Sequence, residues 1–147
     1  MNRAIEFLCG AANPDGLTVQ QVLAMTDDEM EAKHDWVQWA FPTWEPSRYN
    51  PTAPIVLPSE IDSTLLEARV NLKAMEIHYL HFLMTTQHWR HPNDHNHLRI
   101  CRLIKSLRLF RLRGDAEEIY AFAIRATSYS DETRRHWFDA LNERLPL

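Results

Sequence analysis

Histidines are the side chains of this sequence whose spacing comes closest to a chemical site. His88, His91, His95 and His97 occur within ten residues, and imidazole is a common zinc ligand. Two histidines four apart share one face only on a continuous helix, and Pro92 argues against a helix between His91 and His95. We therefore interpret the segment as a polar loop with helix-capping histidines, and we predict no metal and no cofactor.

Another histidine, His34, lies on the apolar side of a predicted helix, in register with Met30, Val37 and Phe41. A histidine in that place is most often a buried neutral side chain that donates one hydrogen bond. If it borders a pocket instead, it could contact a ligand or act as a general base. Gln38 follows one helical turn later and could share such a polar pocket.

The segment 99–113 is the basic part of the chain. Its helical phase points Arg99, Arg102, Lys105 and Ser106 outward and Ile100, Leu103, Ile104 and Leu107 inward, and it contains six Lys or Arg residues and no acid. Outward arginines on a helix that follows a turn resemble a DNA recognition helix. DNA-binding domains are usually basic overall, however, and this chain has a net charge of -4. We expect the arginines to pair with carboxylates of neighbouring helices.

Composition indicates one ordinary globular domain of 147 residues, with 45% hydrophobic and 24% charged residues. Only three glycines are present, which disfavours β-sandwiches, barrels and phosphate-binding loops. Cys9 and Cys101 have no metal-site spacing and are expected to be reduced, apolar side chains. We find no apolar run long enough for a signal peptide or a membrane span and expect a soluble, cytoplasmic protein.

Apolar periodicity and capping residues predict an all-α, single-domain bundle of about six helices over residues 1–147. Thr18 and Thr26 are N-cap residues, with Glu29 completing a capping box, and Gly114 is placed to end a helix. The predicted helices cover 3–9, 18–25, 26–41, 60–86, 94–113, 115–126 and a last segment that starts at Ser130.

The helix predicted over 60–86 carries two apolar stripes and should therefore be central, packed from both sides. The first stripe contains Ile61, Leu65, Ala68, Leu72, Met75, Tyr79 and Leu83, and the second contains Leu66, Val70, Ile77 and Met84.

Five of the eight prolines fall between residues 42 and 58, a segment that we call the strap. Proline ends the preceding helix and favours extended backbone. Trp44, Tyr49 and the Ile55-Val56-Leu57 run are side chains that pack, so an ordered strap across the helices is predicted, with Trp39 as one contact.

Two long blocks of the sequence resemble the conserved region of the opioid growth factor receptor family. The first is His-Asp-Trp-Val-Gln-Trp-Ala-Phe-Pro at 34–42, continued by Glu-Pro-Ser-Arg-Tyr-Asn at 45–50 and Ala-Pro at 53–54. The second is His-Asn-His-Leu-Arg-Ile at 95–100, continued by Arg-Leu-Ile-Lys-Ser-Leu at 102–107. Cys101 stands where the family tends to have threonine.

The resemblance implies a compact form of a family whose vertebrate members are described as receptors for the pentapeptide Met-enkephalin at the nuclear envelope and in the nucleus. It implies no enzymatic reaction. The expected activity is therefore non-enzymatic binding of an unknown peptide or small ligand.

We predict a polar cleft in which His34 and Gln38 approach Asn96 and Arg99 beneath the strap, with Arg99 holding a carboxylate through paired hydrogen bonds. The candidate ligand-binding residues are His34, Gln38, Trp39, Ser47, Asn50, His95, Asn96 and Arg99, and no catalytic residue is assigned. Three alternatives stay open: the same residues only pin the strap, His34 serves an uncharacterised enzyme, or residues 99–113 bind nucleic acid.

Overall fold

The computed structural model describes residues 2–48, 50–127 and 131–146, and within them it is helical, without a strand. The all-α prediction is confirmed. The α-helices are α1 (Arg3–Leu8), α2 (Val19–Leu23), α3 (Asp27–Ala32), α4 (Trp36–Ala40), α5 (Leu66–Thr85), α6 (Asn96–Leu109), α7 (Arg113–Ala126) and α8 (Asp131–Asn142), with 3-10 turns at Pro58–Glu60 and His88–Arg90. Tyr49 and Ser130, which were expected to pack in the strap and to begin the last helix, lie outside the described residues.

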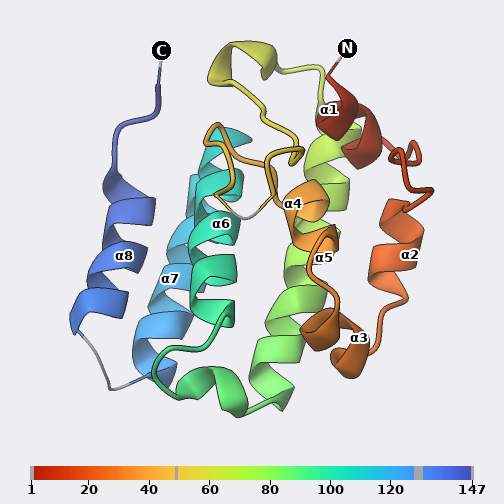
Figure 1. Ribbon diagram of the computed structural model, residues 1–147. Coiled ribbons are helices and arrows are strands. Elements are labelled where there is room, and N and C mark those ends of the chain that lie inside the picture. Colours follow the sequence, from red (N-terminus) through yellow and green to blue (C-terminus); the bar gives the residue numbers. More distant parts are fainter. Residues whose placement is uncertain (1, 49, 128–130, 147) are drawn as a thin grey trace.

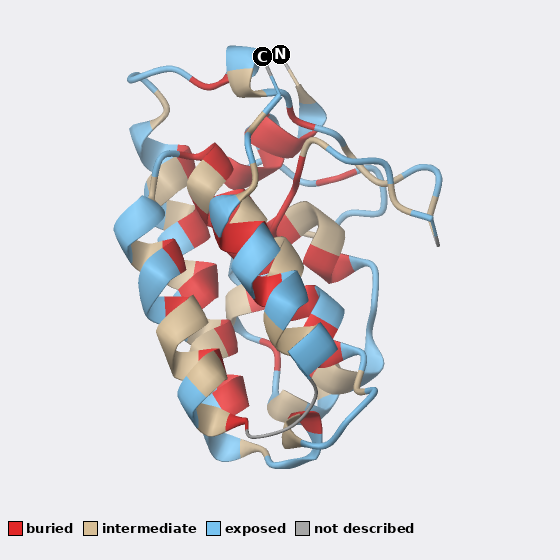
Figure 2. Ribbon diagram, turned by 90° about the vertical axis from the view of Figure 1, so that its left-hand side faces the viewer, coloured by how far each residue is buried: buried red, intermediate tan, exposed pale blue. Residues whose placement is uncertain are grey.

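The helices form two groups that share one core. Helices α6, α7 and α8 pack on one another, and the short helices α1, α2 and α3 pack on the long helix α5 (Figure 1). The buried residues lie on the inward sides of the helices (Figure 2). None of the described helices combines the length and the apolar character needed to cross a membrane.

The predicted N-caps of α2 and α3 are confirmed. The Thr18 side chain accepts from the backbone of Gln21 and the Thr26 side chain from that of Glu29, and both form complete capping boxes. These contacts satisfy backbone N–H groups that have no partner within the first helical turn.

The helix predicted over 26–41 is wrong in its middle, because the chain leaves the helix between α3 and α4. The carbonyls of Met30 and Lys33, which a continuous helix would pair with its own N–H groups, instead accept from the Trp36 indole and the Arg99 guanidinium. His34 consequently leaves the apolar stripe and is exposed. The expectation of a buried His34 is therefore wrong.

The end predicted for the helix over 94–113 is also wrong. Helix α6 stops at Leu109, and Arg111 takes the left-handed conformation with φ 63°. The N–H groups of Arg111 and Leu112 then bond to the carbonyls of Arg108 and Leu107, the pattern of a Schellman cap. Gly114 is not the stop but lies in the first turn of α7.

Helix α5 begins at Leu66 rather than near residue 60, and it is not covered on both sides. Its first apolar stripe is in the core, where Ala68, Leu72, Met75, Tyr79 and Leu83 are fully buried. The second stripe, Leu66, Val70, Ile77 and Met84, is exposed to solvent, so the prediction of a helix packed from both directions is wrong for this chain alone.

The strap crosses from the end of α4 to the start of α5 without a helix among its described residues up to Leu57. Its two arms meet where Val56 N–H donates to the Thr43 carbonyl at 3.0 Å. Both residues are buried, whereas Ile55 and Leu57 are exposed. The strap is thus anchored to the core by alternate residues of its second arm.

Glu76 is a carboxylate buried where α5 faces α7, with only 4% of its surface exposed. The pKa of Glu76 is raised to about 7, mainly by burial and also by the nearby carboxylates of Asp115 and Glu118, whereas Lys73 opposes the shift. The folded state therefore favours protonated Glu76 at pH values at which the unfolded chain has lost that proton.

We expect the free energy of unfolding to fall as pH rises from 4.5 to about 7, by an amount that Glu76→Gln removes. In this window the unfolded chain ionises at the ordinary pKa of 4.5 while the folded protein retains the proton, so unfolding releases a proton and becomes easier. Urea denaturation at pH 5 and pH 8 should show wild type losing on the order of 2 kcal/mol more than the variant. Exposed Glu117→Gln is the control and should keep the wild-type slope; equal slopes for all three proteins would contradict the assignment.

Candidate functional site

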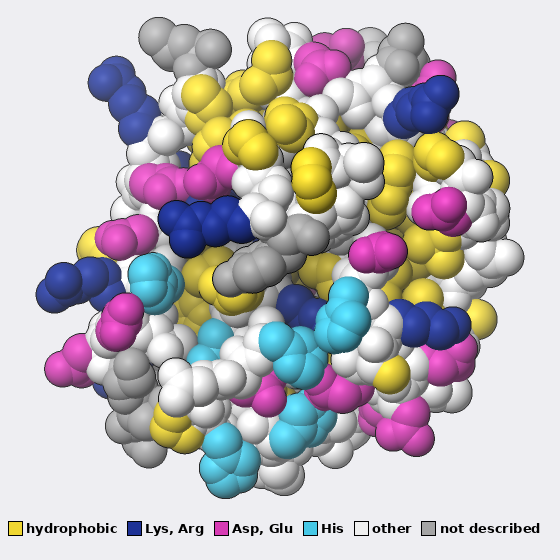
Figure 3. Space-filling view, viewed as in Figure 1, with side chains coloured by type: hydrophobic (Ala, Val, Ile, Leu, Met, Phe, Trp, Pro, Cys, Tyr) yellow, Lys and Arg dark blue, Asp and Glu magenta, His cyan; other side chains and the backbone are white. Residues whose placement is uncertain are grey.

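A cavity of about 510 Å³ lies between α4, the strap and α6. It is lined by His34, Val37, Gln38, Ser47, His95, Leu98, Arg99 and Arg102. Histidine side chains gather in the lower half of the face shown in Figure 3, below the strap. A concave site with apolar walls and a few converging polar groups is the common form of a small-ligand site.

Five of the eight predicted site residues line this cavity: His34, Gln38, Ser47, His95 and Arg99. Two others, Trp39 and Asn50, line a separate cavity of about 710 Å³ that also borders Pro54 and Ile55. Trp39 packs edge-on against Phe7 at 5.9 Å between ring centroids. Asn96 is fully buried. The structure thus brings the two sequence blocks together but divides their polar residues between different places.

Gln38, Ser47 and Asn50 join the strap to α4. The Asn50 amide donates to Gln38 Oε1 at 2.6 Å, and Gln38 Nε2 donates to Ser47 Oγ at 3.4 Å. Ser47 Oγ also accepts from the Asn50 backbone N–H at 3.2 Å. These hydrogen bonds fix one wall of the cavity, which is the role of pinning the strap that the sequence left open.

Arg99 is buried, with 6% of its surface exposed, so its predicted outward orientation is wrong. Its Nη1 donates to the Met30 carbonyl at 2.7 Å and its Nη2 to the Lys33 carbonyl at 2.8 Å. The guanidinium also lies 5.7 Å from the ring of Trp36. Its shortest hydrogen bonds are therefore made to the protein's own backbone and not to a ligand carboxylate.

The contact with Arg99 determines which ring nitrogen of neutral His34 carries the proton. Arg99 Nη2 lies 3.3 Å from His34 Nδ1, and a guanidinium can only donate. Nδ1 is therefore the acceptor, and in neutral His34 the proton is on Nε2. This imidazole can donate a hydrogen bond into the cavity from Nε2, but it has no free basic nitrogen with which to abstract a proton.

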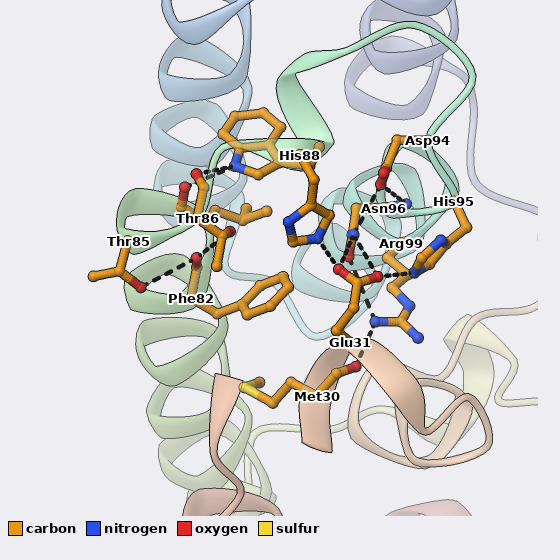
Figure 4. A network of polar contacts seen from close by, with 12 residues as sticks. Met30, Glu31, Phe82, Thr85, Thr86, His88, Asp94, His95, Asn96 and Arg99 are labelled. Carbon is orange, nitrogen blue, oxygen red and sulfur yellow. Dashed lines mark hydrogen bonds and ion pairs between the residues drawn. The ribbon is translucent and has the colours of Figure 1, made fainter. Parts of the chain in front are cut away.

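Beneath the cavity lies a polar network centred on Glu31 and Asn96 (Figure 4). The Glu31 carboxylate contacts His88 Nε2 and His95 Nε2, and it accepts from Asn96 Nδ2 at 3.3 Å. The Tyr79 hydroxyl donates to Asn96 Oδ1 at 2.6 Å, and burial raises the pKa of Tyr79, which keeps that donor protonated. Asn96 therefore supports the site from below.

The histidines at 88 and 95 thus both bond to the carboxylate of Glu31 on α3. Among the residues that the structure describes, no three His, Cys, Asp or Glu side chains are arranged to hold a metal ion. The His34 and His95 rings meet edge to face at 5.8 Å between centroids, which closes the lower edge of the cavity.

Arg102 is the cavity residue that sequence reasoning missed, because its helical phase was taken to point it at solvent. Its Nε is buried without a hydrogen-bond partner, and its Nη2 has a long contact of 3.4 Å with the Gln38 carbonyl. Burial lowers the pKa of Arg102 to about 10, although the charge of Glu45 opposes this shift. The signal was its place three residues after Arg99, which puts both side chains on one side of α6.

Backbone carbonyls are the main partners of the other arginines in 99–113, where carboxylates were predicted, although Arg113 also pairs with the carboxylate of Glu117 at 3.1 Å. Arg108 donates to the carbonyls of Ala140 and Glu143, Arg113 to that of Leu141, and Arg111 to that of Ile61. Lys105 does pair with carboxylates, those of Glu45 and Glu143. Ser106, which was also expected to face solvent, is fully buried.

Comparison with family models, with curated proteins and with solved structures found no match for this chain. The resemblance to the opioid growth factor receptor family therefore stays a prediction from the two sequence blocks, and so does a cytoplasmic location.

Replacing Arg99 by lysine should destabilise the protein by roughly 2–3 kcal/mol, because an ammonium group cannot bond both carbonyls as the planar guanidinium does. Equilibrium urea denaturation measures the effect. The control is Arg125→Lys at an exposed position of α7, which should change stability by less than about 0.5 kcal/mol. Equal stability of Arg99→Lys and wild type would show that the contact between α6 and α3 is not structural.

Proposed function

We propose that the protein is a non-enzymatic binding module, similar in kind to the opioid growth factor receptor family, that binds the carboxylate of a peptide or small ligand in the cavity between α4, the strap and α6. The observation that carries the proposal is Arg102, a half-buried cation that lines this cavity and whose enclosed Nε has no hydrogen-bond partner.

The energetic argument starts from the cost of burying a charge. A guanidinium removed from water without full hydrogen bonding is unfavourable, and the lowered pKa of Arg102, caused by burial, expresses that cost. A ligand carboxylate would supply charge-assisted hydrogen bonds, which are about twice as strong as neutral ones. Arg99, already bonded to two carbonyls, would contribute charge and position rather than new hydrogen bonds.

The walls of the cavity support a ligand with an apolar part next to its acid. Val37 and Leu98 line it together with the polar residues, and Leu98 is 60% exposed although it is apolar. His34 adds a donor at Nε2. A peptide C-terminus with an apolar last side chain has this combination, and Met-enkephalin, the ligand that the family resemblance implies, ends in methionine.

Binding is favoured over the alternative of an enzyme that uses His34 as a base. His34 does border an open cavity, as that alternative requires. Its Nδ1, however, accepts from Arg99, so the available nitrogen carries the proton. The arrangement suits recognition of an acceptor group better than abstraction of a proton.

The test is isothermal titration calorimetry with two matched pairs of probes: acetyl-methionine and its amide, and Met-enkephalin and its C-terminal amide. Wild type should bind the acids at least about tenfold more tightly than the amides, the effect of one charge-assisted hydrogen bond. Arg102→Gln should remove this preference while leaving the thermal unfolding midpoint nearly unchanged, and Arg125→Gln is the matched control.

Two results would refute the proposal: equal affinity of acid and amide for wild type, or an undiminished preference for the acid in Arg102→Gln. Competition by acetate should weaken binding of the acids in wild type and not in the variant, which ties the effect to the carboxylate.

A further inference from the structure

The outer face of α5 is an exposed apolar ridge that the fold leaves uncovered. Leu66 and Val70 are each 67% exposed, Ile77 is 56% exposed and Met84 is 57% exposed. At 100° per residue these positions fall within about 40° of one another around the helix, and they extend over about 27 Å along it. They form one continuous ridge rather than scattered surface side chains.

The opposite face of the same helix is core, with Leu72, Met75, Tyr79, Phe82 and Leu83 fully buried. Helix α5 is therefore apolar on two opposite faces, and the fold covers only one of them. The four ridge side chains expose on the order of 400 Å² per molecule, within the size range of the largest patches on monomers, which are often functional.

The spacing of the ridge is self-complementary. When a second α5 lies antiparallel, centred on residue 75, position 66 faces 84, 70 faces 80, and 73 faces 77. Leu66 then meets Met84, and Val70 lies opposite Leu80, which is half-buried against the protein's own core. Each pair occurs twice, as a two-fold interface requires. The only charged residue on the ridge line, Lys73, faces Ile77, which its aliphatic stem can cover.

The position of Lys73 also selects the direction of pairing. A parallel, in-register pair would bring Lys73 against Lys73 of the second copy, and like charges repel. In the antiparallel register the two lysines are displaced from each other along the helix. Lys73 Nζ also lies 3.4 Å from Asp115 Oδ1 of the same chain.

We propose that the protein forms a two-fold symmetric homodimer through antiparallel contact of the outer faces of two α5 helices. The two ridges, with the half-buried flanking Ala74 and Leu80, bury roughly 1,000 Å² in total, which is below the range of stable interfaces and within that of weak, transient ones. The dimer is therefore expected to be concentration-dependent, with a dissociation constant in the micromolar range.

The antiparallel register predicts that the effect of a charge at position 77 on dimerisation depends on its sign. Ile77→Lys places a second cation opposite Lys73 of the other copy and should weaken dimerisation at least tenfold. Ile77→Glu places an anion opposite that lysine and should retain a measurable part of the association. The matched control is Phe138→Lys on α8, where the apolar side chain is 52% exposed outside the ridge.

Sedimentation equilibrium from 5 to 500 μM measures all four proteins, with circular dichroism to confirm that each is folded. We expect wild type to be dimeric and Ile77→Lys to be monomeric. Ile77→Glu should associate with intermediate affinity, and Phe138→Lys should match wild type. Wild type that stays monomeric at 500 μM overturns the dimer. If lysine and glutamate at position 77 weaken dimerisation equally, the antiparallel register is wrong. If Phe138→Lys abolishes the dimer, the interface is not on α5.

Discussion

Arg99 connects the second half of the chain to the first through the carbonyls of Met30 and Lys33. These two carbonyls end α3, and as long as the guanidinium and the Trp36 indole occupy them, the chain cannot continue as one helix. The chain therefore turns at 33–35, and α4 starts in a new direction. That turn presents His34 and Gln38 to α6 and allows the strap to close over them, so the cavity is a consequence of this contact.

The same interaction recurs at other helix ends. Arg108 and Arg113 donate to the last carbonyls of α8, and Arg69 donates to the Phe110 carbonyl just past α6. A helix terminus leaves carbonyls that need donors, and glycine at the C′ position is the usual local solution. This chain has three glycines, and arginines from distant segments supply the donors instead. That use explains why a segment with six basic residues belongs to an acidic protein.

Features of the fold could be predicted from the sequence where the interacting residues are close together in the chain. The starts of α2 and α3 were predictable because Thr18 and Thr26 find their partners three residues away. The end of α3 was not, because the donor at Met30 comes from Arg99, 69 positions later. The end of α6 was missed for a different reason: its cap is local but places Arg111, rather than a glycine, in the left-handed conformation. The two sequence blocks did predict that His34, Gln38 and Arg99 would meet. They did not predict that the guanidinium of Arg99 would bond to backbone carbonyls, or that Arg102 would form only a longer hydrogen bond.

The difference between Arg99 and Arg102 separates the arginines that hold the fold together from the arginine that is available to a ligand. In the segment 99–113, Arg99, Arg108, Arg111 and Arg113 each donate to a carbonyl at 2.9 Å or less, whereas the contact of Arg102 with the Gln38 carbonyl is 3.4 Å long. Gln38, Ser47 and Asn50 satisfy one another, so they hold the wall beside Arg102 without neutralising it. None of the residues that line this cavity belongs to α5. Pairing through the outer face of α5 would therefore leave each copy with its own complete cavity, and ligand binding and self-association can be varied separately by substitution at 102 and at 77.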